Sequence, residues 1–121
     1  MPHRYRRADR VDELLKQEIA RVVREDVKDP RVGFTTVMDV ASSRDLRHAR
    51  VYISVMGGAE EKEATLDALR SASGFVRSRV GQSITLKYLP ELHFELDRTL
   101  ERAARIEAIL DESRPAEPAD E

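Results

Sequence analysis

The stretch "RSASGFVRSRVGQ", residues 70–82, decides the fold of this chain. Apolar residues keep helical spacing into and through it, at Leu66, Leu69, Ala72, Val76 and Val80. Gly74 nevertheless lies in the middle of the series. The stretch is either one helix that tolerates a glycine at a cost of about 1 kcal/mol, or two helices that meet at a kink with backbone amides open to a ligand. The spacing alone leaves both structures open.

A helix is predicted over residues 8–28, before this stretch. Its apolar residues repeat at steps of three and four positions: Val11, Leu14, Leu15, Ile19, Val22 and Val23. Asp9 is the predicted N-cap. Pro30 should end the helix, because the residue before a proline avoids helical geometry. Asp29 is then a helix-stop and turn residue.

Two strands are predicted over residues 34–41 and 47–56, joined by a hairpin at "SSRDL" (42–46). The second strand alternates cleanly, with one apolar face made by Ala49, Val51, Ile53 and Val55. The first strand is β-branched, and we expect one face to carry Thr36, Met38 and Val40. The two strands should therefore pair as a half-buried hairpin.

Beyond the hairpin, a helix is predicted from about Ala59, after two glycines break the strand. Residues 84–96 form the cleanest period-2 run in the chain and predict a third strand, with Pro90 at an edge or bulge. A last helix should follow. The predicted organisation is a flexible basic arm (1–7), a compact domain (8–97), a C-terminal helix (98–112) and a disordered acidic tail (113–121). The fold class is α+β, with helices on one face of a three-stranded sheet and the other face partly open.

Charge is distributed unevenly along the 121 residues, whose net charge is −2. Residues 111–121 carry five acidic residues and one basic residue, or −4, which leaves +2 on residues 1–110. A cationic arm on a mildly cationic domain suits a polyanionic partner. The sequence has no apolar run long enough to span a membrane, and the N-terminus does not resemble a secretory signal. We therefore expect a cytoplasmic protein.

Catalysis is not expected. The chain has no cysteine, no glycine-rich phosphate loop with a lysine, and no H-E-x-x-H motif. His3, His48 and His93 show no spacing that suggests a metal site, and the last two occupy polar strand positions. We predict a binding protein without cofactor or metal.

Two segments, "KDPRVGFTTVMDVASSRDLRHARVYISV" (28–55) and "SASGFVRSRVGQSITLKYLPELHFELD" (71–97), resemble the ribosome-binding factor A family. The likeness covers about residues 6–110. It implies a type II KH-like fold, α-β-β-α-kink-α-β. The family is a bacterial assembly factor that binds immature 30S subunits through 16S rRNA, supports maturation of the 16S rRNA 5′ end, and is linked to growth after cold shock. These properties follow from the resemblance and not from composition or periodicity.

The resemblance also places an Ala-x-Gly helix kink on Ala72, Ser73 and Gly74, where other KH domains carry Gly-x-x-Gly. A KH loop clamps nucleotide backbone because glycines let phosphates approach main-chain amides. Here we expect Ser73 to cap a helix that starts at Gly74, and Arg77 to close on the same anion. Because this loop departs from the usual KH pattern, direct contact of the kink with RNA stays open.

Basic residues in the arm, the hairpin and the last part of the domain are the remaining candidates for RNA contact: Arg4, Arg6, Arg7, Arg10, Arg44, Arg47, Arg50, Arg77, Arg79 and Lys87. In the arm, Tyr5 could stack on a base. The arm could equally be a solvated terminus, and Arg44–Asp45 could be structural, with Asp45 bonding turn amides.

The overall prediction is a monomeric, non-catalytic factor that binds the 30S subunit and its 16S rRNA. The alternative is a KH-like protein-interaction module that docks through its helices or by strand addition at a sheet edge.

Overall fold

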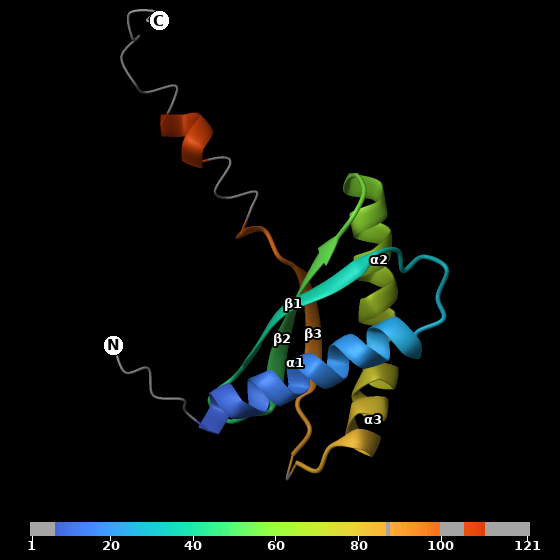
Figure 1. Ribbon diagram of the computed structural model, residues 1–121, viewed down its shortest axis with the longest axis vertical. Coiled ribbons are helices and arrows are strands. Elements are labelled where there is room, and N and C mark those ends of the chain that lie inside the picture. The colour runs from blue at the N-terminus through green and yellow to red at the C-terminus, as the bar shows by residue number, and fades with distance from the viewer. Residues whose placement is uncertain (1–6, 87, 100–105, 111–121) are drawn as a thin grey trace, which may run out of the picture.

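The computed structural model describes residues 7–86, 88–99 and 106–110. Its elements follow the order α1 (Arg7–Glu25), β1 (Thr35–Ser42), β2 (His48–Val55), α2 (Ala59–Ser71), α3 (Ser73–Ser83) and β3 (Glu91–Leu96) (Figure 1). This order confirms the predicted α-β-β-α-kink-α-β arrangement. None of the described helices is long and apolar enough to cross a membrane.

The sheet has the order β1-β2-β3, so β2 is its central strand. β1 pairs with β2 antiparallel and β3 pairs with β2 parallel. The alternation of β2 is confirmed, since every second residue from Ala49 to Val55 is buried. α1 packs on β1, and α2 and α3 pack on β3. The core lies between these helices and one sheet face, and the opposite face carries exposed or half-buried polar residues.

Leu15, Ile19 and Val22 of α1 are fully buried, and Val76, Val80 and Phe94 enter the same core from α3 and β3. Burying side chains of this size stabilises the fold by about 1.5–3 kcal/mol each, before the entropy of ordering them is counted. α1 and α3 also pack directly on each other. The position of α3 is therefore fixed by both the sheet and α1.

The prediction that Thr36, Met38 and Val40 share one face of β1 was wrong. Val37 and Val40 are buried, whereas Met38 is 43% exposed. The register with β2 shifts between Val37 and Asp39, which marks a bulge. A bulge inserts an extra residue and so exchanges the faces on which the following side chains lie.

The third strand is shorter than predicted, because it begins only at Glu91. Glu91 pairs with His48, the first residue of β2, so the chain before Glu91 runs past the end of its neighbouring strand. Ile84, Leu86 and Leu89 still pack against the core. The period-2 pattern of residues 84–90 thus belongs to an extended connection that pairs with no strand among the described residues. Pro90 is fully buried at the strand entrance.

α1 begins and ends earlier than predicted. It starts at Arg7, so Asp9 lies inside the helix and is not its cap. At the other end, the amides of Asp26 and Val27 both donate to the carbonyl oxygen of Val22, which closes the helix before Pro30 is reached. Asp29 accepts hydrogen bonds from the backbone and side chain of Arg31, which confirms it as a turn residue. The Arg31 guanidinium lowers the pKa of Asp29.

Part of the predicted C-terminal helix is described. Thr99 and residues 106–110 have helical geometry, and the amide of Thr99 donates to Oδ1 of Asp97 over 2.9 Å. Ile106, Ile109 and Leu110 are exposed. The rest of the predicted 98–112 helix, most of the arm (1–7) and the acidic tail (113–121) lie outside the described residues.

Candidate nucleic-acid interface

The kink predicted in the opening stretch is present at Ala72, which separates α2 from α3. Ala72 has φ −91° and ψ 4°, outside helical geometry, and it serves both as C-cap of α2 and as N-cap of α3. Its own amide donates to Ala68, and its carbonyl oxygen accepts from Val76 over 2.9 Å. The amides of Ser73, Gly74 and Phe75 belong to the first turn of α3, where N–H groups have no intrahelical acceptor. The stretch is therefore two helices.

The predicted capping role of Ser73 was wrong. α3 begins at Ser73 itself, and the helix has no side-chain cap. Ser73 lines a shallow hollow with Arg70 and residues 91–95 of β3. The hydroxyl therefore lies beside the first turn of α3 instead of closing it.

Gly74 does not need to be glycine for the backbone to bend. Its φ is not in the left-handed region, and a Cβ placed on it would meet nothing within 4 Å. Gly81 in the same helix differs, because a Cβ there would lie 2.9 Å from Cδ2 of Leu89. Because Gly74 has no side chain, a ligand can approach the backbone of the first turn of α3 from solvent.

Arg77 is engaged by the protein itself. Nη2 donates to the carbonyl oxygen of Leu89 over 2.6 Å, and Nε donates to that of Pro90 over 3.1 Å. The side chain therefore ties α3 to the connection that leads into β3. It is not poised over the first turn of α3 as the sequence suggested.

Arg79 and Arg70 lie on either side of this contact along the helices. The Arg79 guanidinium lies 5.2 Å from the centre of the Phe75 ring, a cation–π contact on an exposed part of α3. Arg70 lies just before the kink and donates from Nε to the carbonyl oxygen of Phe94 over 3.2 Å. Arg70 was missed by the sequence analysis, although it opens the quoted stretch.

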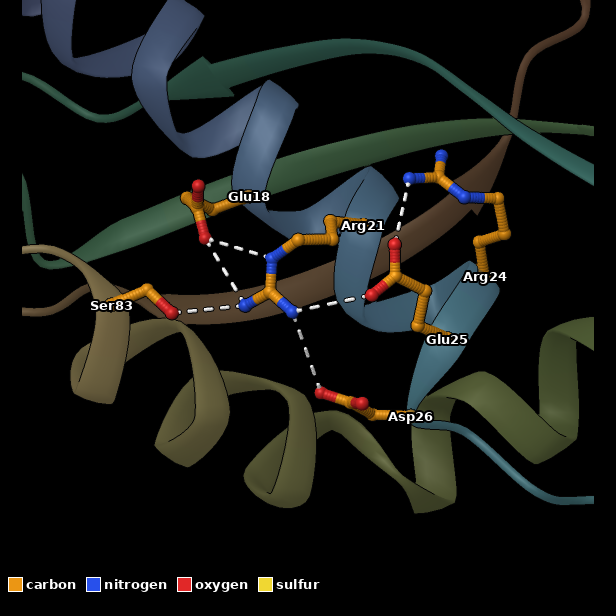
Figure 2. Close-up of polar contacts among 6 residues, drawn as sticks. All are labelled: Glu18, Arg21, Arg24, Glu25, Asp26 and Ser83. Atoms are coloured by element: carbon orange, nitrogen blue, oxygen red, sulfur yellow. Dashed lines mark hydrogen bonds and ion pairs between the residues drawn. The ribbon is translucent and has the colours of Figure 1, made fainter.

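A polar network fixes the far end of α3 against α1. Figure 2 shows the guanidinium of Arg21 between α1 and α3, where Nη2 donates to Oγ of Ser83 over 2.9 Å and to Glu18 over 3.2 Å. Nη1 lies 3.8 Å from carboxylate oxygens of both Glu25 and Asp26. Because these groups neutralise it, Arg21 acts as a structural cation within the domain.

The β1–β2 hairpin is closed by Asp45. Its Oδ1 accepts from Oγ of Ser43 over 2.7 Å and from the amide of Arg47 over 3.1 Å. These hydrogen bonds lower the pKa of the Asp45 carboxyl, with the Ser43 bond as the largest cause. Leu46 adopts φ 60° to complete the turn. The structural alternative for Asp45 is thus confirmed, while Arg44 and Arg47 project from the same turn and are exposed.

The start of α1 lies beside this hairpin. The amide of Ser42 at the end of β1 donates to Oδ1 of Asp12 over 3.1 Å. Arg10, two residues earlier in α1, is exposed. The structure therefore brings Arg10, Arg44 and Arg47 to one end of the molecule, which we call the basic end. Residues 1–6, with Arg4 and Arg6, lie outside the described residues, and Arg7 is described only as the first residue of α1.

The last candidates are separate from the basic end. Arg50 lies on the open face of the sheet, with Nε 3.6 Å from Oε2 of Glu95. On the same face, Nδ1 of His48 lies 3.0 Å from Nε2 of His93. The sequence spacing suggested no metal site at the histidines and gave no sign of this contact, because the parallel register of β2 and β3 brings together residues 45 positions apart. Lys87 lies outside the described residues.

The chain is similar to known proteins over most of its length. The model of the ribosome-binding factor A family matches residues 7–110. The chain belongs to the ribosome-binding factor A family. Ribosome-binding factor A of Desulfitobacterium hafniense is 44% identical over 115 residues, 95% of this chain and 92% of that protein. The protein of Halothermothrix orenii is 43% identical over 94% of this chain and 93% of its own length.

Solved structures agree with the family. The crystal structure of ribosome-binding factor A from Thermus thermophilus superposes with a TM-score of 0.68 at 25% identity, over 76% of this chain and 98% of that one. A homology model of the Thermus protein has also been fitted into the cryo-EM map of a complex of the 30S subunit with ribosome-binding factor A. That model gives a TM-score of 0.60 at 27% identity, over 71% of this chain and 90% of that one. The resemblance noted from the sequence and the KH-like fold that it implies are thereby confirmed.

Proposed function

We propose that the protein binds immature 30S subunits through 16S rRNA and supports maturation of the 16S rRNA 5′ end. It acts as a monomer in the cytoplasm and catalyses no reaction itself. Membership of the ribosome-binding factor A family supports this function, as does the 30S complex of the Thermus relative. A factor of this kind acts by binding a surface of its target. It therefore needs positive charge and a complementary surface, and no reactive centre.

The observation that carries the proposal is the basic end. Arg10, Arg44 and Arg47 are exposed around the junction of α1 with the hairpin, and the arm with Arg4, Arg6 and Arg7 leads into the same helix. Arginine binds phosphate oxygens in a bidentate manner, and each neutralised phosphate releases counterions. The structural cations Arg21 and Arg77 are bound within the domain, whereas the arginines of the basic end are exposed.

The kink supplies a second proposed contact. The amides of the first turn of α3 favour an anion such as phosphate, and the absence of a side chain at Gly74 lets nucleic-acid backbone come close. Arg79 follows on the exposed side of the same helix. RNA backbone laid along α3 would meet these groups in turn.

The experiment that tests the proposal is a binding titration with purified 30S subunits over a salt series, together with a 16S precursor assay. We expect log affinity to fall linearly with log salt, since the contacts are ionic. Cells without the protein should accumulate 16S rRNA with an unprocessed 5′ end, and the purified protein alone should leave that precursor uncut. Absence of 30S binding at low salt would overturn the proposal.

One observation favours the docking alternative. Phe34 and Met56 are 81% and 75% exposed, and they lie side by side because the amide of Met56 donates to the carbonyl oxygen of Phe34. If an apolar contact with a protein held the complex, Phe34→Ser would weaken binding and salt would have little effect on it. The salt series therefore separates the two functions.

A further inference from the structure

The open face of the sheet brings three metal-ligating groups together at the start of β3. In the parallel register, His48 lies opposite Glu91, and His93 lies opposite Arg50. Nδ1 of His48 is 3.0 Å from Nε2 of His93, and Oε1 of Glu91 is 3.5 Å from the same Nε2. All three side chains are exposed, and their ligand atoms lie within 4.8 Å of one another.

Hydrogen bonds within the cluster engage few of its donors and acceptors, and the rest face solvent. Each neutral imidazole has one N–H and one lone pair, and an ionised carboxylate only accepts. One proton on Nε2 of His93 can serve His48 or Glu91, but the 3.5 Å separation from Glu91 is long for a hydrogen bond. The three ligand atoms therefore lie within 4.8 Å of one another, with at most one proton between the two rings. A cation held among them would take a ligand from each residue.

Two of the three ligand-atom separations are close to those around a tetrahedral ion. Zn²⁺ binds histidine nitrogen and carboxylate oxygen at about 2.1 Å, so two of its ligand atoms stand about 3.4 Å apart. The observed separations, 3.0 and 3.5 Å, lie on either side of that value. We propose that His48, Glu91 and His93 bind a divalent transition-metal ion, with Zn²⁺ as the occupant, across β2 and β3. This inference does not depend on the proposed function.

The chemistry of the ligands selects the class of metal. Imidazole suits Zn²⁺, Ni²⁺ and Cu²⁺, whereas Mg²⁺ and Ca²⁺ require oxygen ligands. Three protein ligands leave a fourth position for water or for a group of a bound partner. Arg50, the nearest cation along the strand, is drawn toward Glu95 on the side away from His48. Its charge is thereby partly neutralised beside the site.

An ion in this position would link the first residue of β2 to the start of β3. β3 is an edge strand of six residues, and its parallel pairing with β2 joins distant parts of the chain. A ligand that binds only the folded state raises stability by mass action. Zn²⁺ should therefore raise the melting temperature and protect the β3 amides from hydrogen exchange.

The test uses the full chain without a histidine tag, titrated with Zn²⁺ by calorimetry and followed by NMR of the histidine rings. We expect saturable 1:1 binding, with shifts at His48 and His93. His48→Gln and His93→Gln should abolish it, and Glu91→Gln should lower the affinity by at least about tenfold. His3→Gln is the matched control and should bind as the wild type does.

Circular dichroism and melting of each variant without metal show whether the fold is kept, as expected for exposed positions. No saturable binding to the wild-type chain would overturn the proposal. So would binding that survives in the His48→Gln, His93→Gln double variant, because the ion would then be held by the acidic tail or another group. Ring shifts at His3 alone would have the same meaning.

Discussion

Nη2 of Arg77 donates a hydrogen bond of 2.6 Å to the carbonyl oxygen of Leu89, the residue before the buried Pro90. The contact joins the middle of α3 to the chain that enters β3. The guanidinium donates to the Leu89 carbonyl oxygen, which lies in the extended connection before β3 and is not paired with a described strand. Arg77 thereby positions β3 relative to the kinked helix pair.

Arg77→Ala should destabilise the domain by about 1–2 kcal/mol, since hydrogen bonds to charged groups contribute about 1.5–3 kcal/mol and these are partly solvated. Urea unfolding followed by circular dichroism measures this. Arg79→Ala, two residues on, is the control and should change stability by less than about 0.5 kcal/mol. Unchanged stability in Arg77→Ala with weaker 30S binding would show instead that Arg77 serves RNA.

Arg21→Ala should lower the free energy of unfolding by about 1 kcal/mol or slightly more. The change removes the bond to Ser83 and leaves Glu18, Glu25 and Asp26 close together without their shared cation (Figure 2). Arg24→Ala, on the exposed side of α1, should fall within about 0.5 kcal/mol of wild type, because exposed ion pairs contribute little. Equal effects of the two substitutions on thermal unfolding would contradict a special role for Arg21.

Most of the fold could be predicted from local pattern. The helical periodicity of α1 and the alternation of β2 are set by which face is buried, and both are visible in the sequence. The kink could not be settled by spacing, since the apolar series continues straight through Ala72. It depends on how α2 and α3 pack separately on β3, which is a tertiary effect.

Several of the errors share a physical cause, because they depend on where a neighbouring element lies or ends. The 84–90 segment alternates as a strand does, but β2 ends at His48 and offers no partner there. The bulge after Val37 is likewise set by pairing with β2. The His48–His93 pair needs the parallel register, and Arg77 needs the path of residues 89–90. The spacing of residues in the sequence does not predict these tertiary contacts.

Asp45→Asn should lower the melting temperature at neutral pH, because the folded turn favours the ionised carboxyl. The pKa of Asp45 is lowered from its ordinary value of 3.8 by the Ser43 hydroxyl and the Arg47 amide. The stabilisation is therefore present above pH 3.8 and is lost as the pH falls through the lower, folded-state pKa. Melting curves of wild type and variant should converge in that acidic range. A difference that is constant with pH would contradict this origin.

The double variant Arg44→Ala, Arg47→Ala should bind 30S subunits more weakly and with a smaller salt dependence. Each lost phosphate contact removes about 0.7–0.9 from the slope of log affinity against log salt. Stability should stay near the wild-type value, because the turn is held by Asp45 and the arginine side chains are exposed. Arg24→Ala, near the other end of α1, serves as a control that removes one positive charge outside the basic end. An unchanged slope in the double variant would exclude the hairpin from the interface.

Gly74→Ala separates the structural role of this glycine from its role in binding. The backbone tolerates alanine, and the new Cβ meets nothing within 4 Å, so the variant should be as stable as wild type or up to about 1 kcal/mol more stable. If RNA backbone approaches the first turn of α3, the added methyl group blocks it. Affinity for 30S subunits should then fall roughly tenfold, equivalent to one charge-assisted hydrogen bond of about 1.5 kcal/mol.

Gly81→Ala is the matched control within the same helix. Its Cβ would lie 2.9 Å from Cδ2 of Leu89, so the side chain of Leu89 must move and the helix-propensity gain should be offset. Binding should be unaffected, because Gly81 is at the other end of α3 from the kink. Melting temperature and 30S affinity should be measured on both variants, and the expected patterns are opposite. Gly74→Ala should be stable and bind poorly. Gly81→Ala should gain no stability and bind normally. A Gly74→Ala protein that melts no lower than wild type and binds 30S subunits equally well would show that the kink is only a feature of helix packing.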